Sequence, residues 1–281
     1  MLSSGIPQRE EYLRLEAQPL YKELLEFSRQ FDQRFIAENT PASRYSSKWV
    51  KDPFLQWSRR WEYVYVAQQL AVWLAGERGT KTVVDAGSGF TFYPFFLLQT
   101  HANLHIKCFD HDPLAGKALM DAKRILDRGP GFHIEDLESL TQESETVDGV
   151  YSVSVIEHTS NPHAVINEVN RILKPGGLFI CTFDVSFESR SPMYTRRVEQ
   201  LVKHIEKVFK LPDDWPPIAF DALSKDESIV TTLWDAHTIK SGLPWQRPRL
   251  IWLYDMFRFR FRASVPRPMT FCCLTMIKKP A

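Results

Sequence analysis

An aspartate stands directly before a glycine-rich turn in the segment VVDAGSG, residues 83–89. A turn between a strand and a helix brings backbone N–H groups close to a ligand at the carboxyl edge of an α/β sheet. A dinucleotide prefers a third glycine, but Phe92 takes that position. The dinucleotide's pyrophosphate would also meet the Asp85 carboxylate at short range. The pattern therefore favours a ligand with a cationic head, held by Asp85, Gly87 and Gly89.

A second chemical signal is the histidine of VIEH, which follows the apolar run GVYSVSV. A histidine titrates near neutrality, so it is the natural side chain to take a proton from a hydroxyl group. We expect His158 to stand at the same sheet edge as the Asp85 turn. Glu157 would then be either its neighbour or an acid that faces the ligand.

Five apolar runs must position these side chains, and they read as the strands TVVDA, IKCFD, FHIE, GVYSVSV and GLFICTF. They alternate with helix-like segments over residues 82–184, which is typical of a parallel sheet wrapped by helices. Asp112-Pro113 and Asn161-Pro162 each predict a helix start, because a capping side chain precedes a proline. The segment KPGG, residues 174–177, predicts the end of the second helix.

The segments on either side of this core differ from it in pattern. Residues 1–80 have helical spacing and predict a helical cap, residues 81–184 the ligand-binding core, residues 185–250 an insertion, and residues 251–281 a closing hairpin. Within that hairpin, the alternation of apolar residues and arginines over 256–262 predicts an edge strand. TFCCLTMI is apolar on both faces and predicts a strand inside the sheet.

Composition excludes some classes of function. Lys and Arg number 35 against 34 Asp and Glu, so no global positive field favours nucleic acid. No apolar run approaches eighteen residues and the amino terminus lacks a leader pattern, so we expect a cytoplasmic protein without a membrane partner. The four cysteines lack metal-type spacing and read as buried thiols.

The segments VVDAGSG, CFDHDP, IEDLESL, VDGVYSVSVIEH and LKPGGLFI resemble, in order and spacing, the class I S-adenosylmethionine-dependent methyltransferases, and most closely their small-molecule branch. The resemblance covers roughly residues 60–184. It implies a Rossmann-like, doubly wound mixed sheet of seven strands with the last strand antiparallel. It also implies S-adenosylmethionine as the cofactor, whose ammonium and sulfonium suit an acid at the turn.

The resemblance places the cofactor residue by residue. Asp85, Gly87 and Gly89 would line its methionine half, and a Thr stands at position 91 where the family often has a further glycine. Asp110 would accept hydrogen bonds from both ribose hydroxyls, since a carboxylate can accept two hydrogen bonds from a diol. Asp136 and Leu137 would contact the adenine. Tyr63, in the helix that precedes the strand before the glycine turn, completes the predicted site.

These expectations describe methyl transfer to a small molecule, with oxygen as the favoured acceptor atom and His158 as the general base. Carbon and nitrogen acceptors, an NAD-dependent oxidoreductase and a non-catalytic cofactor-binding regulator are the alternatives. Glu157 and Asn161 match three oxygen ligands poorly, so no metal is expected. One or two of the tryptophans, which all lie outside residues 82–184, are expected to line an apolar acceptor pocket. The sequence leaves the monomer and the homo-oligomer equally open.

Overall fold

The computed structural model describes the chain except residues 38–53, 55, 127, 213–214, 242–266 and 281. A seven-stranded sheet is its centre, with the strand order β3-β2-β1-β4-β5-β7-β6. The strands are β1 (Lys81–Ala86), β2 (Leu104–Asp110), β3 (Gly131–Ile134), β4 (Val147–Val153), β5 (Leu173–Ser186), β6 (Phe209–Lys210) and β7 (Met269–Lys278). The first five are parallel, whereas β7 runs antiparallel to both β5 and β6. The predicted Rossmann-like mixed sheet is therefore confirmed.

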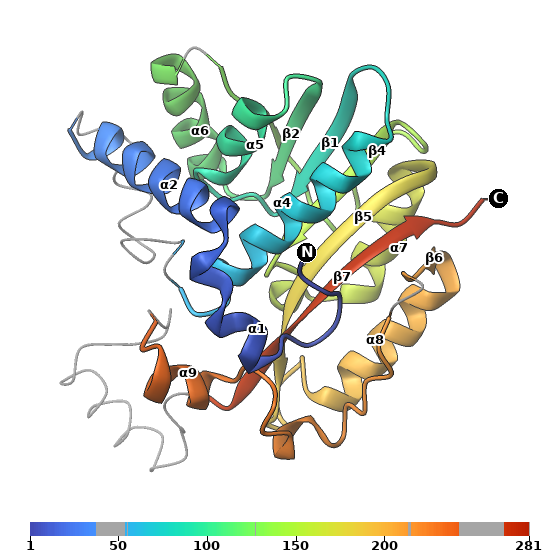
Figure 1. Ribbon diagram of the computed structural model, residues 1–281. Helices are drawn as coiled ribbons and strands as arrows, with labels where there is room; N and C mark the ends of the chain where they lie inside the picture. Colours follow the sequence, from blue (N-terminus) through green and yellow to red (C-terminus); the bar gives the residue numbers. More distant parts are fainter. Residues whose placement is uncertain (38–53, 55, 127, 213–214, 242–266, 281) are drawn as a thin grey trace.

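Helices cover both faces of this sheet (Figure 1). The longer helices are α2 (Pro19–Ala37), α4 (Arg59–Ala75), α5 (Tyr93–Thr100), α6 (Pro113–Leu126), α7 (Pro162–Ile172) and α8 (Thr195–Val208). The shorter ones are α1 (Arg9–Leu13), η1 (Leu15–Ala17), η3 (Ile156–His158), η4 (Leu223–Lys225) and α9 (Thr232–Thr238). In Figure 1, α4 crosses in front of the sheet, and α7 lies behind it.

Two apolar cores result from the alternation of side chains along the strands. In β5, Leu178 and Ile180 face the core beneath α4, α5 and α6, while Phe179 and Cys181 face the core beneath α7 and α8. The four cysteines are buried free thiols, as the sequence predicts. Both faces of the central strands are buried, which explains why their sequences are apolar runs rather than alternating patterns.

The predicted helix starts are confirmed. Asn161 caps α7 by accepting the backbone N–H of Ala164, and the Asp112 side chain accepts the backbone N–H of Leu114 at the start of α6. The helix end differs slightly from expectation: α7 stops at Ile172, and the KPGG segment lies within β5 at a shift of register against β4. The strand pairing begins there directly after the helix.

The closing strand lies inside the sheet, between β5 and β6, as its two apolar faces predict. The predicted arginine-striped strand, residues 256–262, lies outside the described residues. Where the structure is described, the neighbour beyond β7 is instead the two-residue strand β6, which belongs to the predicted insertion, residues 185–250. A pairing of two residues is too short to show any period.

Candidate functional site

The predicted turn joins β1 to α5 at the carboxyl edge of the sheet. Gly87 and Gly89 have φ values of 78° and 50°, a region that glycine adopts without strain. The backbone N–H groups of Gly87 and Ser88 donate to the Phe109 carbonyl of β2 at 2.8 and 3.1 Å. A Cβ on Gly87 would lie 2.3 Å from Val155 Cγ1, so close packing against the end of β4 also requires glycine there.

Asp85 lies in β1 just before this turn, and the residue is only 5% exposed. No ion pair among the described residues includes it. Burial raises the pKa of Asp85 to about 8. The nearby Tyr151 hydroxyl lowers this pKa, and the charge of Asp110 raises it. That hydroxyl is itself buried and falls short of hydrogen-bond geometry. The site therefore holds a buried carboxyl group without a cation, which suits a positively charged ligand.

Asp110 is the last residue of β2, and its side chain stabilises the neighbouring turn through hydrogen bonds. One carboxylate oxygen accepts the Gly89 N–H at 2.7 Å and the other accepts the Asp112 N–H at 2.8 Å. The side chain keeps 12% of its surface exposed. A carboxylate oxygen accepts two hydrogen bonds, so each oxygen retains one lone pair for a diol.

The segment after β3 holds the predicted adenine contacts. Asp136 is exposed and accepts the Glu138 N–H at 2.9 Å, whereas Leu137 is buried. The preceding Glu135 is the residue that sequence reasoning passed over. It is buried and accepts the backbone N–H and the hydroxyl of Thr141 at 2.9 and 2.6 Å, which closes the loop.

Tyr63, in α4, packs against the helix that follows the glycine turn. Its ring stacks on Tyr93 at a centroid distance of 4.5 Å, and the Tyr93 hydroxyl donates to the Tyr63 carbonyl at 2.9 Å. Burial raises the pKa of Tyr63 to about 12; the charges of Arg59 and Asp85 modify it in opposite directions. Tyr63 thus lies close to the Asp85 turn.

A second polar cluster, unnoticed in the sequence, lies where α4 meets the ends of β4 and β5. Glu62 is fully buried and its Oε2 atom pairs with Arg59 Nη1 at 2.6 Å. The Ser154 hydroxyl donates to the other Glu62 oxygen at 2.7 Å. Both charged oxygens of Glu62 are therefore matched by donors. The signal was present in α4, because a glutamate among aromatic residues predicts a buried acid that needs partners.

Glu157 and Asp184 join this cluster without such partners. The Asp184 backbone N–H donates to Glu157 Oε1 at 3.4 Å, but Glu157 Oε2 and Asp184 Oδ1 are withdrawn from solvent and lack any hydrogen bond. Burial raises the pKa of both carboxyl groups, that of Asp184 to about 7, and each is affected by the charges of Glu62 and Arg59. The two acids also repel each other's ionised form.

His158 ends the short helix η3 after β4, as predicted, at the carboxyl edge of the sheet. The residue is exposed, and its backbone N–H donates to the Val155 carbonyl at 2.8 Å. Partial burial of the ring and the nearby charge of Arg59 lower the pKa of His158. The imidazole is therefore mainly neutral at pH 7 and able to accept a proton.

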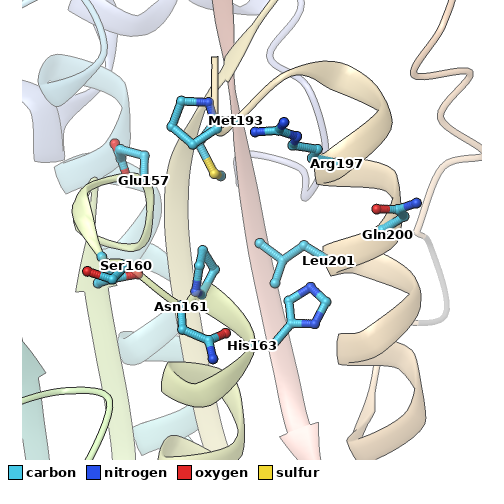
Figure 2. Close-up of a pocket in the computed structure, with 11 residues that line it drawn as sticks. Glu157, Ser160, Asn161, His163, Met193, Arg197, Gln200 and Leu201 are labelled. Carbon is cyan, nitrogen blue, oxygen red and sulfur yellow. The ribbon is translucent and has the colours of Figure 1, made fainter. Parts of the chain in front are cut away.

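A cavity of about 350 Å³ opens beside Glu157, between the start of α7 and α8 (Figure 2). Ser160 and Asn161 lie on one side of it, with Arg197 and Gln200 of α8 on the other. Its lining is mixed polar and apolar rather than aromatic. Trp234 packs edge-on against Tyr12 at a centroid distance of 5.8 Å and also lines a second cavity of about 620 Å³, so the expectation that a tryptophan lines the acceptor pocket stays a prediction.

The described residues contain neither a cluster of metal ligands nor a helix that could span a membrane. No group of three or more His, Cys, Asp or Glu side chains in that part of the chain is arranged to hold a metal ion. Among the helices described, none has the length and apolar character needed to cross a membrane.

Comparison with known proteins identifies the central segment. Residues 84–181 match the family described as a methyltransferase domain. The dimethylglycine N-methyltransferase of Parasynechococcus marenigrum (strain WH8102) is 30% identical over 107 residues, which is 38% of this chain and 35% of that protein. The chain thus covers about a third of the curated relative that it matches.

One solved structure shares the fold at lower identity. A protein from Galdieria sulphuraria, provisionally named a sarcosine dimethylglycine methyltransferase, has a TM-score of 0.51 at 12% identity, over 77% of this chain and 86% of that chain. Phosphoethanolamine N-methyltransferase 2 of Haemonchus contortus, in complex with S-adenosyl-L-methionine, has a TM-score of 0.49 at 15% identity, over 76% of this chain and 52% of that chain.

Proposed function

The chain contains a class I S-adenosylmethionine-dependent methyltransferase domain, and from that premise we propose that it transfers a methyl group from S-adenosylmethionine to a small molecule. The observation that carries the proposal is the turn after β1. Asp85 is buried without a cationic partner, beside two glycines in left-handed conformations and the half-satisfied carboxylate of Asp110. This donor and acceptor set fits a ligand with an ammonium group and a ribose diol.

The residues present fit the cofactor as follows. Asp85 would hold the ammonium group, with Gly87 and Gly89 lining the methionine half, while the free lone pairs of Asp110 would accept the ribose hydroxyls. The adenine would lie against Leu137 with Asp136 accepting its amine. The bound cofactor would supply an electrophilic methyl group on a sulfonium.

Phe92 argues against the nicotinamide alternative. It stands where a dinucleotide site prefers glycine, and its buried ring packs on Tyr63 at 5.3 Å. The buried Asp85 carboxyl group adds to this, because its ionised form would repel a pyrophosphate at the turn.

For an oxygen acceptor, His158 is the base that we propose. Its imidazole is largely neutral at pH 7 and stands at the same sheet edge as Asp85. It would take the hydroxyl proton as the acceptor oxygen forms its bond to the methyl carbon, while the surrounding residues orient the acceptor and exclude water.

A nitrogen acceptor is the second candidate, and one observation favours it. Glu157, which precedes His158 in the chain, and Asp184 are two carboxyl groups outside the ion pairs of the described residues, which is an environment that attracts an ammonium ion. The local similarity to an N-methyltransferase is consistent with this candidate.

Calorimetry of the full chain with S-adenosylhomocysteine and with NAD⁺ tests the cofactor. We expect micromolar affinity for S-adenosylhomocysteine and none for NAD⁺; the opposite result contradicts the proposal. Incubation with methyl-labelled S-adenosylmethionine and fractionated small metabolites then tests catalysis. Tight cofactor binding with no labelled product in any fraction would favour the non-catalytic regulator.

A further inference from the structure

The cluster between α4 and the ends of β4 and β5 contains more negative than positive groups. The carboxyl groups of Glu62, Glu157 and Asp184 lie near Arg59, whose guanidinium pairs directly with Glu62. Among the ion pairs of the described residues, none includes Glu157 or Asp184. The cation nearest to the cluster is thus already used by Glu62, and two carboxyl groups remain without a counter-ion.

The unmatched oxygens are also cut off from water. Glu157 Oε2 and Asp184 Oδ1 are buried and have no hydrogen-bond donor. A buried acceptor without a donor costs on the order of 1–3 kcal/mol, and more when it is charged. The neighbouring Glu62, by contrast, has a donor for each of its two carboxylate oxygens.

A cavity adjoins one of these two acids, and it is an observation independent of the charges. Glu157 forms part of the wall of the space of about 350 Å³ beside α8, with Asn161, Arg197 and Gln200 on its other sides (Figure 2). This volume lies at the lower end of the range for small-molecule sites in proteins. Glu157 therefore borders a space large enough for a small organic molecule, whereas Asp184, whose backbone N–H donates to Glu157, does not line it.

The acids also lie near the proposed cofactor turn. Glu157 follows β4, whose partner strand β1 carries Asp85, and Val155 at the end of β4 packs against Gly87. The neighbouring helix α4 links the two regions, since Glu62 faces the acid cluster and Tyr63 lies next to the turn. An acceptor in the cavity would thus approach the cofactor past Glu157.

Resting on the methyl transfer proposed above, we propose that the acceptor is a small amine. It binds as an ammonium ion between Glu157 and Asp184, with its remaining atoms in the cavity. One of the two carboxylates takes one N–H proton, leaving a neutral amine. The nitrogen lone pair then forms the N–C bond as the S–CH₃ bond breaks, the bonding electron pair stays on sulfur, and the carboxyl group later returns its proton to solvent.

The raised pKa values of the two carboxyl groups suit this role, because a base works best when its pKa lies near the operating pH. The groups facing the pair are Glu62 and Arg59 of α4, with the thiol of Cys181 close to Glu157. An ammonium ion between the acids would replace the proton that they otherwise hold, and it would donate to both unmatched oxygens.

The test compares acceptors on the full chain with methyl-labelled S-adenosylmethionine. The probes are small primary and secondary amines and their isosteric alcohols. We expect label on amines, and a fall of at least about 100-fold in kcat/KM for the best amine in Asp184→Asn and Glu157→Gln. Preference for alcohols, label on neither set, or both variants within threefold of the parent overturns the proposal.

The affinity for S-adenosylhomocysteine distinguishes a failure of the proposed function from a failure of the acceptor assignment. In Asp184→Asn, the affinity for S-adenosylhomocysteine should stay within threefold of the parent, because the Asp184 side chain is not placed at the cofactor. Loss of binding in the unmodified protein would contradict the proposed function itself. Normal binding without transfer to amines would contradict the acceptor assignment alone.

Two further measurements distinguish a binding role from a structural one. The variants should be at least as stable as the parent at pH 8.5, because each removes an unmatched buried charge; lower stability would indicate structural carboxyl groups. The ascending limb of kcat/KM against pH should disappear in the variant of the carboxylate that takes the proton. A limb unchanged in both variants would contradict proton transfer to this pair.

The cavity is tested by a matched pair on α8. Gln200→Trp fills the space and should raise KM for the amine more than tenfold, with the affinity for S-adenosylhomocysteine unchanged. Arg196→Trp introduces the same bulk at an exposed neighbour that does not line the cavity, and it should leave KM unchanged. Equal effects of the two substitutions would place the acceptor elsewhere.

Discussion

The two halves of the sheet's carboxyl edge treat their acids differently. At the end of β2, both oxygens of Asp110 accept backbone N–H groups, which fix the turn before any ligand arrives. At the ends of β4 and β5, Glu157 and Asp184 each keep a buried oxygen without a donor. The backbone organises the first half in advance, whereas the second half leaves two buried carboxylate oxygens without a donor.

This difference matches the demands of the proposed reaction. A cofactor that is the same in every turnover is best bound by a rigid frame, because preorganisation removes the cost of ordering at binding. An acceptor that loses a proton needs groups able to change their own protonation state. Unmatched carboxyl groups with raised pKa values meet that need, and a carboxylate already fixed by two N–H groups does not.

The largest effect is expected from Gly87→Ala. Its Cβ would lie 2.3 Å from Val155 Cγ1, and its φ of 78° is unfavourable for alanine. We expect a loss of roughly 2–5 kcal/mol in the free energy of unfolding, measured by denaturant titration, together with loss of cofactor affinity. The double variant with Val155→Ala should recover the part of the loss that is steric. Full stability of Gly87→Ala would contradict the rigid-frame half of the comparison.

Asp85→Asn should come next. Removing the charge deprives an ammonium group of its partner, so we expect affinity for S-adenosylhomocysteine to fall roughly 30- to 100-fold, or about 2–3 kcal/mol. Asp148→Asn is the control, since Asp148 pairs with Lys174 at 2.8 Å at the opposite end of β4. Equal losses in both variants would mean that Asp85 does not bind the cofactor.

Asp85 should also make the free energy of unfolding depend on pH, and Asp85→Asn tests this. The pKa of Asp85 is about 8 in the folded protein against an ordinary value near 4, so the folded state binds more protons than the unfolded state between these values. The contribution of Asp85 to stability is therefore complete below pH 4 and is lost as the pH rises to 8. Denaturation at pH 5 and pH 8.5 should show a smaller decline in Asp85→Asn than in the parent.

Asp110→Asn should have a smaller effect. The amide has one acceptor oxygen instead of two, so one of the two backbone bonds or one ribose contact is lost. We expect a roughly 5- to 20-fold weaker affinity for S-adenosylhomocysteine, or about 1–2 kcal/mol. Asp112→Asn retains the cap of α6 and should leave the affinity unchanged. An unaffected Asp110→Asn would remove Asp110 from the proposed cofactor site.

His158→Asn should have the smallest effect on kcat/KM, and it tests most directly which group takes the proton. If Glu157 and Asp184 take the proton, kcat/KM should change by less than about threefold, below about 0.7 kcal/mol. His101→Asn, in the loop after α5, serves as the reference for loss of a histidine remote from the site. A fall of more than tenfold in His158→Asn, with loss of a pH limb, would restore histidine base catalysis and an oxygen acceptor.

The parallel core, the turn and the helix caps could be predicted because each depends on neighbours in sequence. Apolar runs, proline after a capping residue and the acid before glycines are local signals. The matched acid of α4 could not be predicted in the same way, since Glu62 and Ser154 are 92 positions apart and meet only through tertiary packing.

Asp184 was within reach of the rule that singled out Asp85 and Asp110. All three are acids at the end of an apolar strand sequence, and carboxyl ends of parallel strands share one edge of the sheet. The pairing of Asp184 with Glu157 depends on the register of β4 against β5, where Val153 lies opposite Thr182. Sequence pattern alone does not fix that register.

The helix α4 imposes a limit on how molecules enter and leave this enzyme. Its residues from Arg60 to Ala67 are all buried, so this first part of the helix is covered all round, whereas Val72 in the second part is 57% exposed. A helix in that position acts as a fixed wall, because swinging it outward would expose the aromatic core around Trp61. The acceptor and the products must therefore enter and leave through openings elsewhere on the surface.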